Sequence, residues 1–342
     1  MGHRKKSAPR HGSLAFRPRG RAGDIVPRVK NWADVNSPKP ILLGFVGFKA
    51  GTTHAIVAGD NPRSPTFGKS LFKVTTVISV PPMTVCGIRL YGKDVRGEHA
   101  LCDVYSNKLS KLYERAFPRG YLKGKFDVGV LDALIEKTKR IVLIVGVEPS
   151  EANLPQKKPI ILEIDVGGGK SMKERLDFAK SVLGSKVKLK DVFKPGDFVD
   201  TIGITRGKGF QGPVKRFGIK RKQHKSRKSV RAVGCIGPWH PAAVTYAVAR
   251  AGQMGFSQRT EYGKRILVCD STKEGEMFNP KGGFEHYGVV TGDFVVLEGT
   301  VQGPPKRPVV LRFSMRRREE KVEAPKLLHL NVSPIPIKGA AQ

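Results

Sequence analysis

The sequence predicts an α+β protein whose body carries two basic arms. Short runs of β-branched and apolar residues, bounded by turn residues, occur both before and after one long segment that has no acidic residue. Helical periodicity falls mainly within one part of this strand pattern. Positive charge is concentrated in two segments rather than spread evenly. These observations indicate a strand-rich body, a helical insert and two appendages.

The predicted strands are short and rich in Val, Ile and aromatic residues, and Gly, Pro, Asn or Asp stand near their ends. Because they lie on both sides of the acid-free segment, they favour a closed barrel as the body. They are residues 41–48, 74–80, 85–91, 141–147, 160–164 and 198–204 before the acid-free segment, and 265–269, 287–290, 294–299 and 309–313 after it.

Helices are predicted where apolar residues recur every three or four positions. The predicted helices are residues 98–117, 131–140, 173–183 and 242–251. The first three lie close together and form one helical insert at about residues 97–186. The fourth follows the acid-free segment directly.

The first arm is a basic N-terminal extension, residues 1–36. Seven Lys or Arg and no acidic residue precede Asp24, among Gly, Pro and Ser that disfavour regular structure. Such a block of charge is either an RNA-binding arm or a solvated, disordered tail.

The second arm is a central finger, residues 205–261, between body segments 37–204 and 262–342. Thirteen Lys or Arg and no Asp or Glu lie between Asp200 and Glu261. Apolar side chains such as Phe210 and Phe217 interrupt the charge, which favours a defined shape on RNA over a solvated tail.

The charge indicates a polyanionic partner. Lys and Arg number 62 against 29 Asp and Glu, a net charge of +33. Nucleic acid neutralises such an excess through its phosphates. An acidic membrane surface is the rival, but no stretch approaches the roughly 18 to 20 apolar residues of a spanning helix. The N-terminus lacks the apolar region of a secretory signal, so we expect a cytoplasmic protein.

Two glycine-rich motifs resemble nucleotide-binding loops, but the residues around them do not fit that function. The glycines of residues 207–212 fit a dinucleotide pattern, but Pro213 follows and no carboxylate appears before Glu261. Residues 167–171 resemble the end of a phosphate-binding loop but have Ile164 at the place of the leading glycine, which favours a glycine-rich helix entry. The four cysteines have no metal or disulfide spacing and are expected to be buried. We therefore expect no enzyme, no cofactor and no metal site.

Trp239 and His240 form the most informative short cluster, at the end of the basic segment. Trp239 is either a core residue or an aromatic that stacks on nucleotides near the tip of the finger. The predicted RNA-binding residues are Arg4, Lys5, Lys6, Arg10, His11, Arg17, Arg19, Arg21, Arg206, Lys208, Lys215, Arg216, Lys220, Arg221, Lys222, Lys225, Arg227, Lys228, Arg231, Trp239, His240 and Arg250.

The same segments carry a family resemblance. Residues 205–212 (Thr-Arg-Gly-Lys-Gly-Phe-Gln-Gly) and 235–241 (Cys-Ile-Gly-Pro-Trp-His-Pro) resemble the ribosomal protein L3 family, as do residues 8–14, 44–54, 81–83 and 249–253. The resemblance covers nearly the whole chain, and its length and insert look archaeal.

The resemblance implies a six-stranded barrel of the translation-protein type with a helical insert, an N-terminal arm and a long finger loop. It implies a structural protein that binds and compacts large-subunit ribosomal RNA, with Trp239 near the finger tip, toward the peptidyl transferase centre. Expected neighbours are ribosomal proteins L14 and L24e, with no membrane or small-molecule partner. Two other classes stay open, an enzyme acting on RNA and a general basic scaffold protein that prefers duplex DNA.

Overall fold

The computed structural model describes residues 9–118, 129–226, 229–272, 279–280, 282–316 and 324–331. The chain divides into two compact units. Unit 1 combines Met1–Ile25 with Ile204–Arg259, and unit 2 combines Val26–Gly203 with Thr260–Gln342. Segments far apart in the sequence therefore belong to one unit in both cases.

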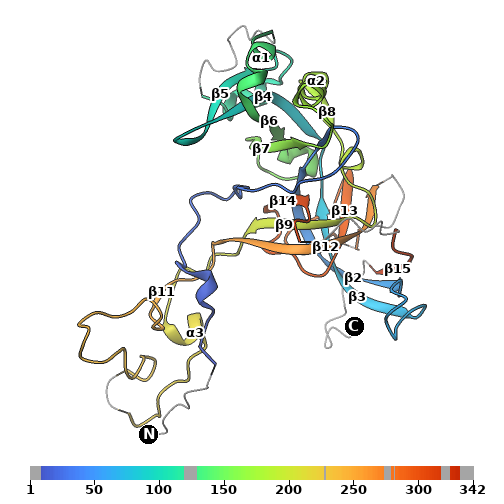
Figure 1. Ribbon diagram of the computed structural model, residues 1–342. Coiled ribbons are helices and arrows are strands. Elements are labelled where there is room, and N and C mark those ends of the chain that lie inside the picture. Colours follow the sequence, from blue (N-terminus) through green and yellow to red (C-terminus); the bar gives the residue numbers. More distant parts are fainter. Residues whose placement is uncertain are drawn as a thin grey trace. The chain divides into compact units, whose positions relative to one another are not determined.

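Unit 2 contains a sheet in which neighbouring strands run antiparallel (Figure 1). Helices α1 (Gly129–Ala133) and α2 (Met172–Val182) accompany this sheet, and α2 contacts three of its strands. The strands, in spatial order, are β1 (Ile41–Leu42), β7 (Ile160–Gly167), β6 (Thr138–Val147), β4 (Met83–Asp94) and β5 (Gly97–Tyr105), and β8 (Lys186–Val187) pairs with β4.

The second sheet has seven strands. In spatial order they are β14 (Pro308–Phe313), β9 (Phe198–Ile204), β12 (Gln258–Ser271), β13 (Asp293–Glu298), β3 (Ser70–Ser79), β2 (Gly44–Ala58) and β15 (Leu327–Asn331). Strand β14 pairs with β2 as well as with β9, and the register places Val310 opposite both Val46 and Ile202. Each of the six strands other than β15 therefore has two hydrogen-bonded neighbours among these six.

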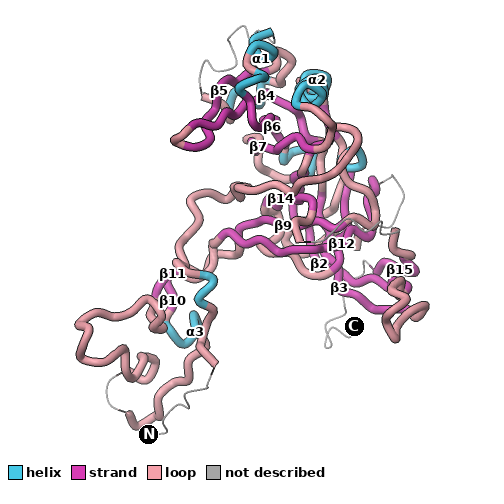
Figure 2. Tube along the Cα trace, viewed as in Figure 1, coloured by secondary structure: helices cyan, strands magenta, loops and turns pink. Residues whose placement is uncertain are grey.

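The remaining regular elements are short. Unit 2 contains the 3-10 turns η2 (Lys111–Arg115), η4 (Ile135–Lys137), η5 (Pro149–Ala152) and η6 (Leu189–Asp191). Apart from the ends of β9 and β12, unit 1 contains η1 (Leu14–Phe16), β10 (Phe210–Gln211), α3 (Pro213–Phe217) and β11 (Gly252–Gln253). Most of the described part of unit 1 is loop (Figure 2).

The apolar core lies in unit 2, where one continuous cluster draws side chains from both sheets. Phe45 and Ile78 come from the seven-stranded sheet and Leu143 and Ile164 from the other, and all four are fully buried. Removing this surface from water is the main source of stability for unit 2. No comparable cluster is found among the described residues of unit 1.

Most predicted strands are confirmed, and so is the helix at 173–183, which is α2. The predicted helix at 98–117 is wrong because the segment begins as β5, whose pairing with β4 overrides its helical pattern. Residues 131–140 hold only the end of α1 and η4 before β6 starts. Among its described residues, the insert at 97–186 thus contains more strand than α-helix.

Two further predicted elements are absent. Residues 242–251 form no helix, because residues 242–246 are exposed and a helix this short needs an apolar face to pack on. Residues 287–290 form no strand; Phe284 and Gly288 make one isolated bridge, although Tyr287 and Val290 are buried.

The glycine-rich run before α2 is a helix entry, as predicted. Ser171 accepts a hydrogen bond from the Glu174 backbone N–H at 3.2 Å, and the Glu174 carboxylate accepts one from the Lys170 N–H at 2.9 Å. Two side chains of the protein therefore accept hydrogen bonds from backbone amides at the start of α2, where a phosphate would bind. No helix within the described ranges is long and apolar enough to cross a membrane.

The expectation that the cysteines are buried is correct for Cys86 and Cys269. It is wrong for Cys235, which is exposed, and Cys102 is half-buried. Burial raises the pKa of the Cys86 and Cys269 thiols to about 12, so both stay protonated at neutral pH.

Candidate nucleic-acid interface

The predicted RNA-binding residues that the structure describes all belong to unit 1. Arg4, Lys5, Lys6, Arg227 and Lys228 lie outside the described residues. The half-buried members are Arg17, Arg19, Arg216 and Lys222. The exposed ones are Arg10, His11, Arg21, Arg206, Lys208, Lys215, Lys220, Arg221, Lys225, Arg231, Trp239, His240 and Arg250.

Helix α3 is the one α-helix among the described residues of unit 1. Gly212 is its N-cap and Pro213 its first residue, a position where the missing N–H of proline costs nothing. The helix ends at Gly218, which adopts the left-handed conformation with φ of 64°. The last residue of the helix, Phe217, is only 6% exposed.

Three guanidinium groups surround the Phe217 ring. The Arg19 guanidinium carbon lies 4.3 Å from the ring centroid, and those of Arg17 and Arg216 lie 5.1 and 5.2 Å from it. Such distances are those of cation–π contacts. Gly12 lies against the same group, since a Cβ on it would be 2.7 Å from Phe217 and from Arg19 Nη2. The N-terminal segment therefore packs on α3.

Backbone carbonyls fix two of these arginines. Arg19 donates from Nη1 to the Arg216 carbonyl at 3.2 Å and from Nη2 to the Ser13 carbonyl at 3.3 Å. Arg216 donates from Nε to the Gln253 carbonyl at 2.9 Å and from Nη1 to the Arg250 carbonyl at 3.1 Å. Carbonyl oxygens orient a guanidinium but carry no negative charge to compensate it.

The N-terminal segment also contacts the end of the basic internal segment. The Ala22 N–H donates to the Phe256 carbonyl at 2.7 Å, and the Ser257 hydroxyl donates to the Gly20 carbonyl at 3.1 Å. The Arg259 guanidinium carbon lies 4.8 Å from the centroid of the Phe16 ring. These contacts and the Phe217 group join residues more than 190 positions apart.

Burial lowers the pKa of the Arg19 and Arg216 guanidinium groups, and repulsion among the neighbouring arginines lowers it further. Arg17 contributes to both shifts. Both groups stay charged at any physiological pH. The contribution of the neighbouring arginines agrees with the short distances from the three guanidinium groups to one ring.

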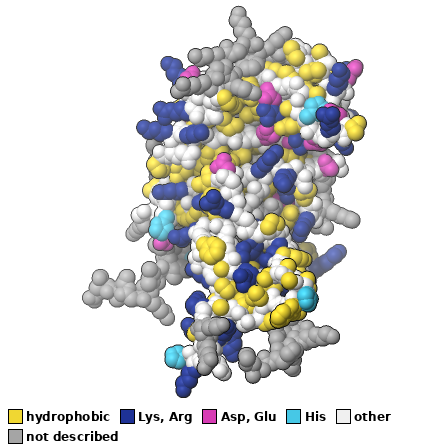
Figure 3. Space-filling view, turned by 90° about the vertical axis from the view of Figure 1, so that its left-hand side faces the viewer, with side chains coloured by type: hydrophobic (Ala, Val, Ile, Leu, Met, Phe, Trp, Pro, Cys, Tyr) yellow, Lys and Arg dark blue, Asp and Glu magenta, His cyan; other side chains and the backbone are white. Residues whose placement is uncertain are grey.

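Away from α3, unit 1 exposes large aromatic side chains. Trp239 is 88% exposed and Tyr246 is 71% exposed, so neither is a core residue of the chain. In the view of Figure 3, hydrophobic side chains lie next to Lys and Arg side chains in the lower part of the picture. Exposed rings among cations can stack on unpaired bases, because every base presents a π-face.

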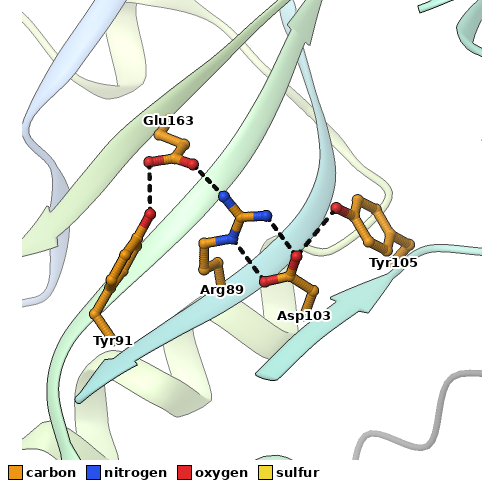
Figure 4. Close-up of polar contacts among 5 residues, drawn as sticks. All are labelled: Arg89, Tyr91, Asp103, Tyr105 and Glu163. Atoms are coloured by element: carbon orange, nitrogen blue, oxygen red, sulfur yellow. Dashed lines mark hydrogen bonds and ion pairs between the residues drawn. The ribbon is translucent and has the colours of Figure 1, made fainter. Parts of the chain in front are cut away.

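Arginines of unit 2 have a different environment, and Figure 4 shows the best example. Arg89 on β4 donates to Asp103 on β5, with Nε 2.6 Å from Oδ1, and also to Glu163 on β7. These carboxylates raise the pKa of Arg89, and Glu163 also accepts from the Tyr91 hydroxyl at 3.0 Å. The charge of Arg89 is thus compensated within the chain.

Sequence reasoning missed two features of the interface. It treated Phe217 as one of several interspersed apolar residues and did not identify it as the anchor for three arginines. It also left out Arg259, which stacks on Phe16. The available signal was local: Phe217 directly follows a basic pair and precedes a glycine that can end a helix.

Comparisons with known proteins agree with one another. The family profile described as Ribosomal protein L3 matches residues 1–333. The large ribosomal subunit protein uL3 of Methanococcus vannielii is 46% identical over 96% of this chain and 97% of its own length. The uL3 proteins of Methanocaldococcus jannaschii and Methanocorpusculum labreanum are 44% and 42% identical over 95% and 93% of the chain, and over 96% and 95% of their own lengths.

Proposed function

The chain belongs to the ribosomal protein L3 family and is a structural protein of the large ribosomal subunit in the cytoplasm, and we propose that its basic unit 1 binds and compacts large-subunit ribosomal RNA. The observation that carries this proposal is the composition of unit 1. Its two segments contain 20 Lys or Arg and one acidic residue, Asp24. Phosphates from RNA helices that converge on this unit would supply the missing negative charge.

The proposed organisation keeps the division that the sequence predicts. Residues 1–36 form a basic extension and residues 205–261 a finger, while residues 37–204 and 262–342 form a body built on a six-stranded barrel. The pairing of β14 with both β2 and β9 supports the barrel. The body would fix the position of the arms while their cations reduce repulsion between RNA backbones.

The finer placement is proposed from the resemblance to the family. We propose that the finger reaches toward the peptidyl transferase centre with Trp239 near its tip, and that ribosomal proteins L14 and L24e are neighbours. The 88% exposure of Trp239 supports a stacking role. The chain would position RNA around that centre and perform no chemistry itself.

The test is crosslinking and sequencing of the RNA bound to this protein in its native cells, beside a variant that lacks residues 206–238. We expect crosslinks to large-subunit RNA, with those near the peptidyl transferase centre lost in the variant. Crosslinks scattered over messenger RNA or DNA would favour a general basic scaffold. Turnover of RNA by the purified protein, lost when a carboxylate of unit 2 is mutated, would favour an enzyme.

A further inference from the structure

The arginines around Phe217 are close enough to repel one another. Each guanidinium carbon lies between 4.3 and 5.2 Å from one ring centroid. Any two of them are therefore at most about 10 Å apart, which is about one Debye length at 0.1 M salt. The ring attracts each cation through its negative face, but the repulsion between the cations remains.

No described residue of unit 1 compensates these charges. Asp24 is the one acidic residue in its two segments, and it accepts a hydrogen bond from the Ile25 N–H. Arg19 and Arg216 donate to carbonyls, which are neutral. The Nε atoms of Arg17 and Arg19 are buried and have no hydrogen-bond partner in the part of the chain that the structure describes. The three guanidinium groups thus carry positive charge that no described carboxylate of unit 1 compensates, and two of their Nε–H donors have no acceptor among the described residues.

We propose that Arg17, Arg19 and Arg216 bind one backbone phosphate of RNA, and that this phosphate holds the N-terminal segment against α3. The inference rests on the proposed RNA binding and adds a defined site to it. A phosphate carries the negative charge that the cluster lacks, and its oxygens match the planar fork of a guanidinium. An acidic peptide could supply the charge too, but the cationic surface of unit 1 continues beyond the cluster and favours a polyanion.

The site makes docking of the N-terminal segment depend on the anion. Arg17 and Arg19 come from that segment, whereas Arg216 comes from α3. Repulsion between the two parts opposes their contact until an anion neutralises it. The Ala22 N–H, which donates to the Phe256 carbonyl, reports on the same contact because it is protected only while the segment is docked.

The experiment compares the full-length protein with Arg19→Gln, and uses Arg21→Gln as the matched control. Arg21 lies two residues away in the same segment and is exposed. Hydrogen exchange of the Ala22 amide is measured in chloride, in inorganic phosphate at equal ionic strength and with a large-subunit RNA fragment. Affinity for that fragment is measured in parallel, and Arg19→Lys tests whether charge without the planar fork is enough.

We expect phosphate and RNA, but not chloride, to slow Ala22 exchange in the wild type and in Arg21→Gln, and neither to slow it in Arg19→Gln. Arg19→Gln should lose about tenfold more RNA affinity than Arg21→Gln, because it removes a charge-assisted contact to the phosphate that Arg21 does not make. Arg19→Lys should recover part of the affinity.

Equal losses in Arg19→Gln and Arg21→Gln, or protection by chloride, would overturn the site while leaving RNA binding intact. Protection by inorganic phosphate without protection by RNA would reduce the cluster to an adventitious anion site. If the wild type did not bind the RNA fragment at all, the proposed function itself would fail. Slow exchange equal in all solutions would show that docking needs no anion.

Discussion

The two units of the chain differ in how they hold arginine. In unit 2, Arg89, Arg265 and Arg312 each form an ion pair with a carboxylate of the same unit. In unit 1, Arg19 and Arg216 donate to backbone carbonyls and stack on an aromatic ring. Defined contacts orient these arginines in both units, but only those of unit 2 have a carboxylate as their partner.

The same difference holds for composition. Unit 1 has 20 basic residues and one acidic residue, which leaves 42 basic and 28 acidic residues for unit 2. Unit 2 also holds the apolar core that stabilises a fold without a partner. Positive charge is therefore almost uncompensated in the unit that has little apolar core of its own, where a polyanion can contribute to its stability.

The largest expected effect is the salt dependence of RNA binding. If about ten cations of unit 1 contact phosphate, the slope of log affinity against log salt should be roughly −7 to −9. Affinity for large-subunit RNA should then fall by about 10⁴ to 10⁵ between 50 and 200 mM salt. Filter binding or fluorescence anisotropy over a salt series measures this slope.

A substitution in unit 2 provides the control. Lys180 pairs with Asp132 at 2.5 Å, so Lys180→Gln should leave the slope unchanged, while deletion of residues 206–238 should reduce it strongly. A wild-type slope near −2, or an equal reduction from Lys180→Gln, would contradict the division of charge between the units.

The next largest effect is expected at the buried ion pair of unit 2. Asp200 is fully buried, accepts from Arg312 at 3.0 Å, and also accepts from the Gly263 and Met315 N–H groups. Asp200→Ala leaves a buried guanidinium without its carboxylate, which should lower the free energy of unfolding by about 3 to 5 kcal/mol. Urea denaturation measures the change.

The matched control is Asp132→Ala. The Asp132 side chain is 62% exposed, so losing its pair with Lys180 should cost about 1 kcal/mol or less. Similar losses from both substitutions would mean that burial does not distinguish the ion pairs of unit 2.

Much of unit 2 could be predicted from the sequence, because a half-buried or buried strand leaves a local pattern. The runs at 74–80, 141–147 and 294–299 became β3, β6 and β13 with small shifts at their ends. The failures share one cause, which is that tertiary pairing decided the outcome. Residues 98–105 form a strand because β4 offers an edge, and no local pattern records that neighbour.

The sequence predicts which residues belong to the candidate site, but it does not predict the contacts between them. An acid-free segment is visible in one sequence, so the sequence alone selects every cation of unit 1 except Arg259. The contact of Gly12 and Arg19 with Phe217 could not be predicted, since it joins positions about 200 residues apart. Carbonyl acceptors for arginine leave no sequence signal at all, because every residue has one.

A smaller effect is expected at Asp165, which is buried in the sheet 3.6 Å from Arg140. Burial raises the pKa of this carboxyl to about 7 from an ordinary value of 3.8, while Arg140 opposes the shift and Glu163 and Glu98 add to it. The folded state therefore binds the proton more tightly, and stability should fall as pH rises from about 4 to 7. Asp165→Asn should flatten this dependence in urea denaturation at pH 5 and 8; an unchanged profile would contradict the shift.

The smallest effect separates the two tryptophans of the chain. Trp32 packs against the core of unit 2 and its ring lies next to Gly44, whereas Trp239 is 88% exposed. Trp239→Ala should leave the free energy of unfolding unchanged and lower RNA affinity by about 1 to 3 kcal/mol, the contribution of one stacked base. Trp32→Ala should do the reverse and destabilise the fold by about 2 kcal/mol or more. If Trp239→Ala weakened the fold instead of RNA binding, its side chain would have an intramolecular partner, and exposed aromatics in unit 1 would no longer indicate stacking on RNA.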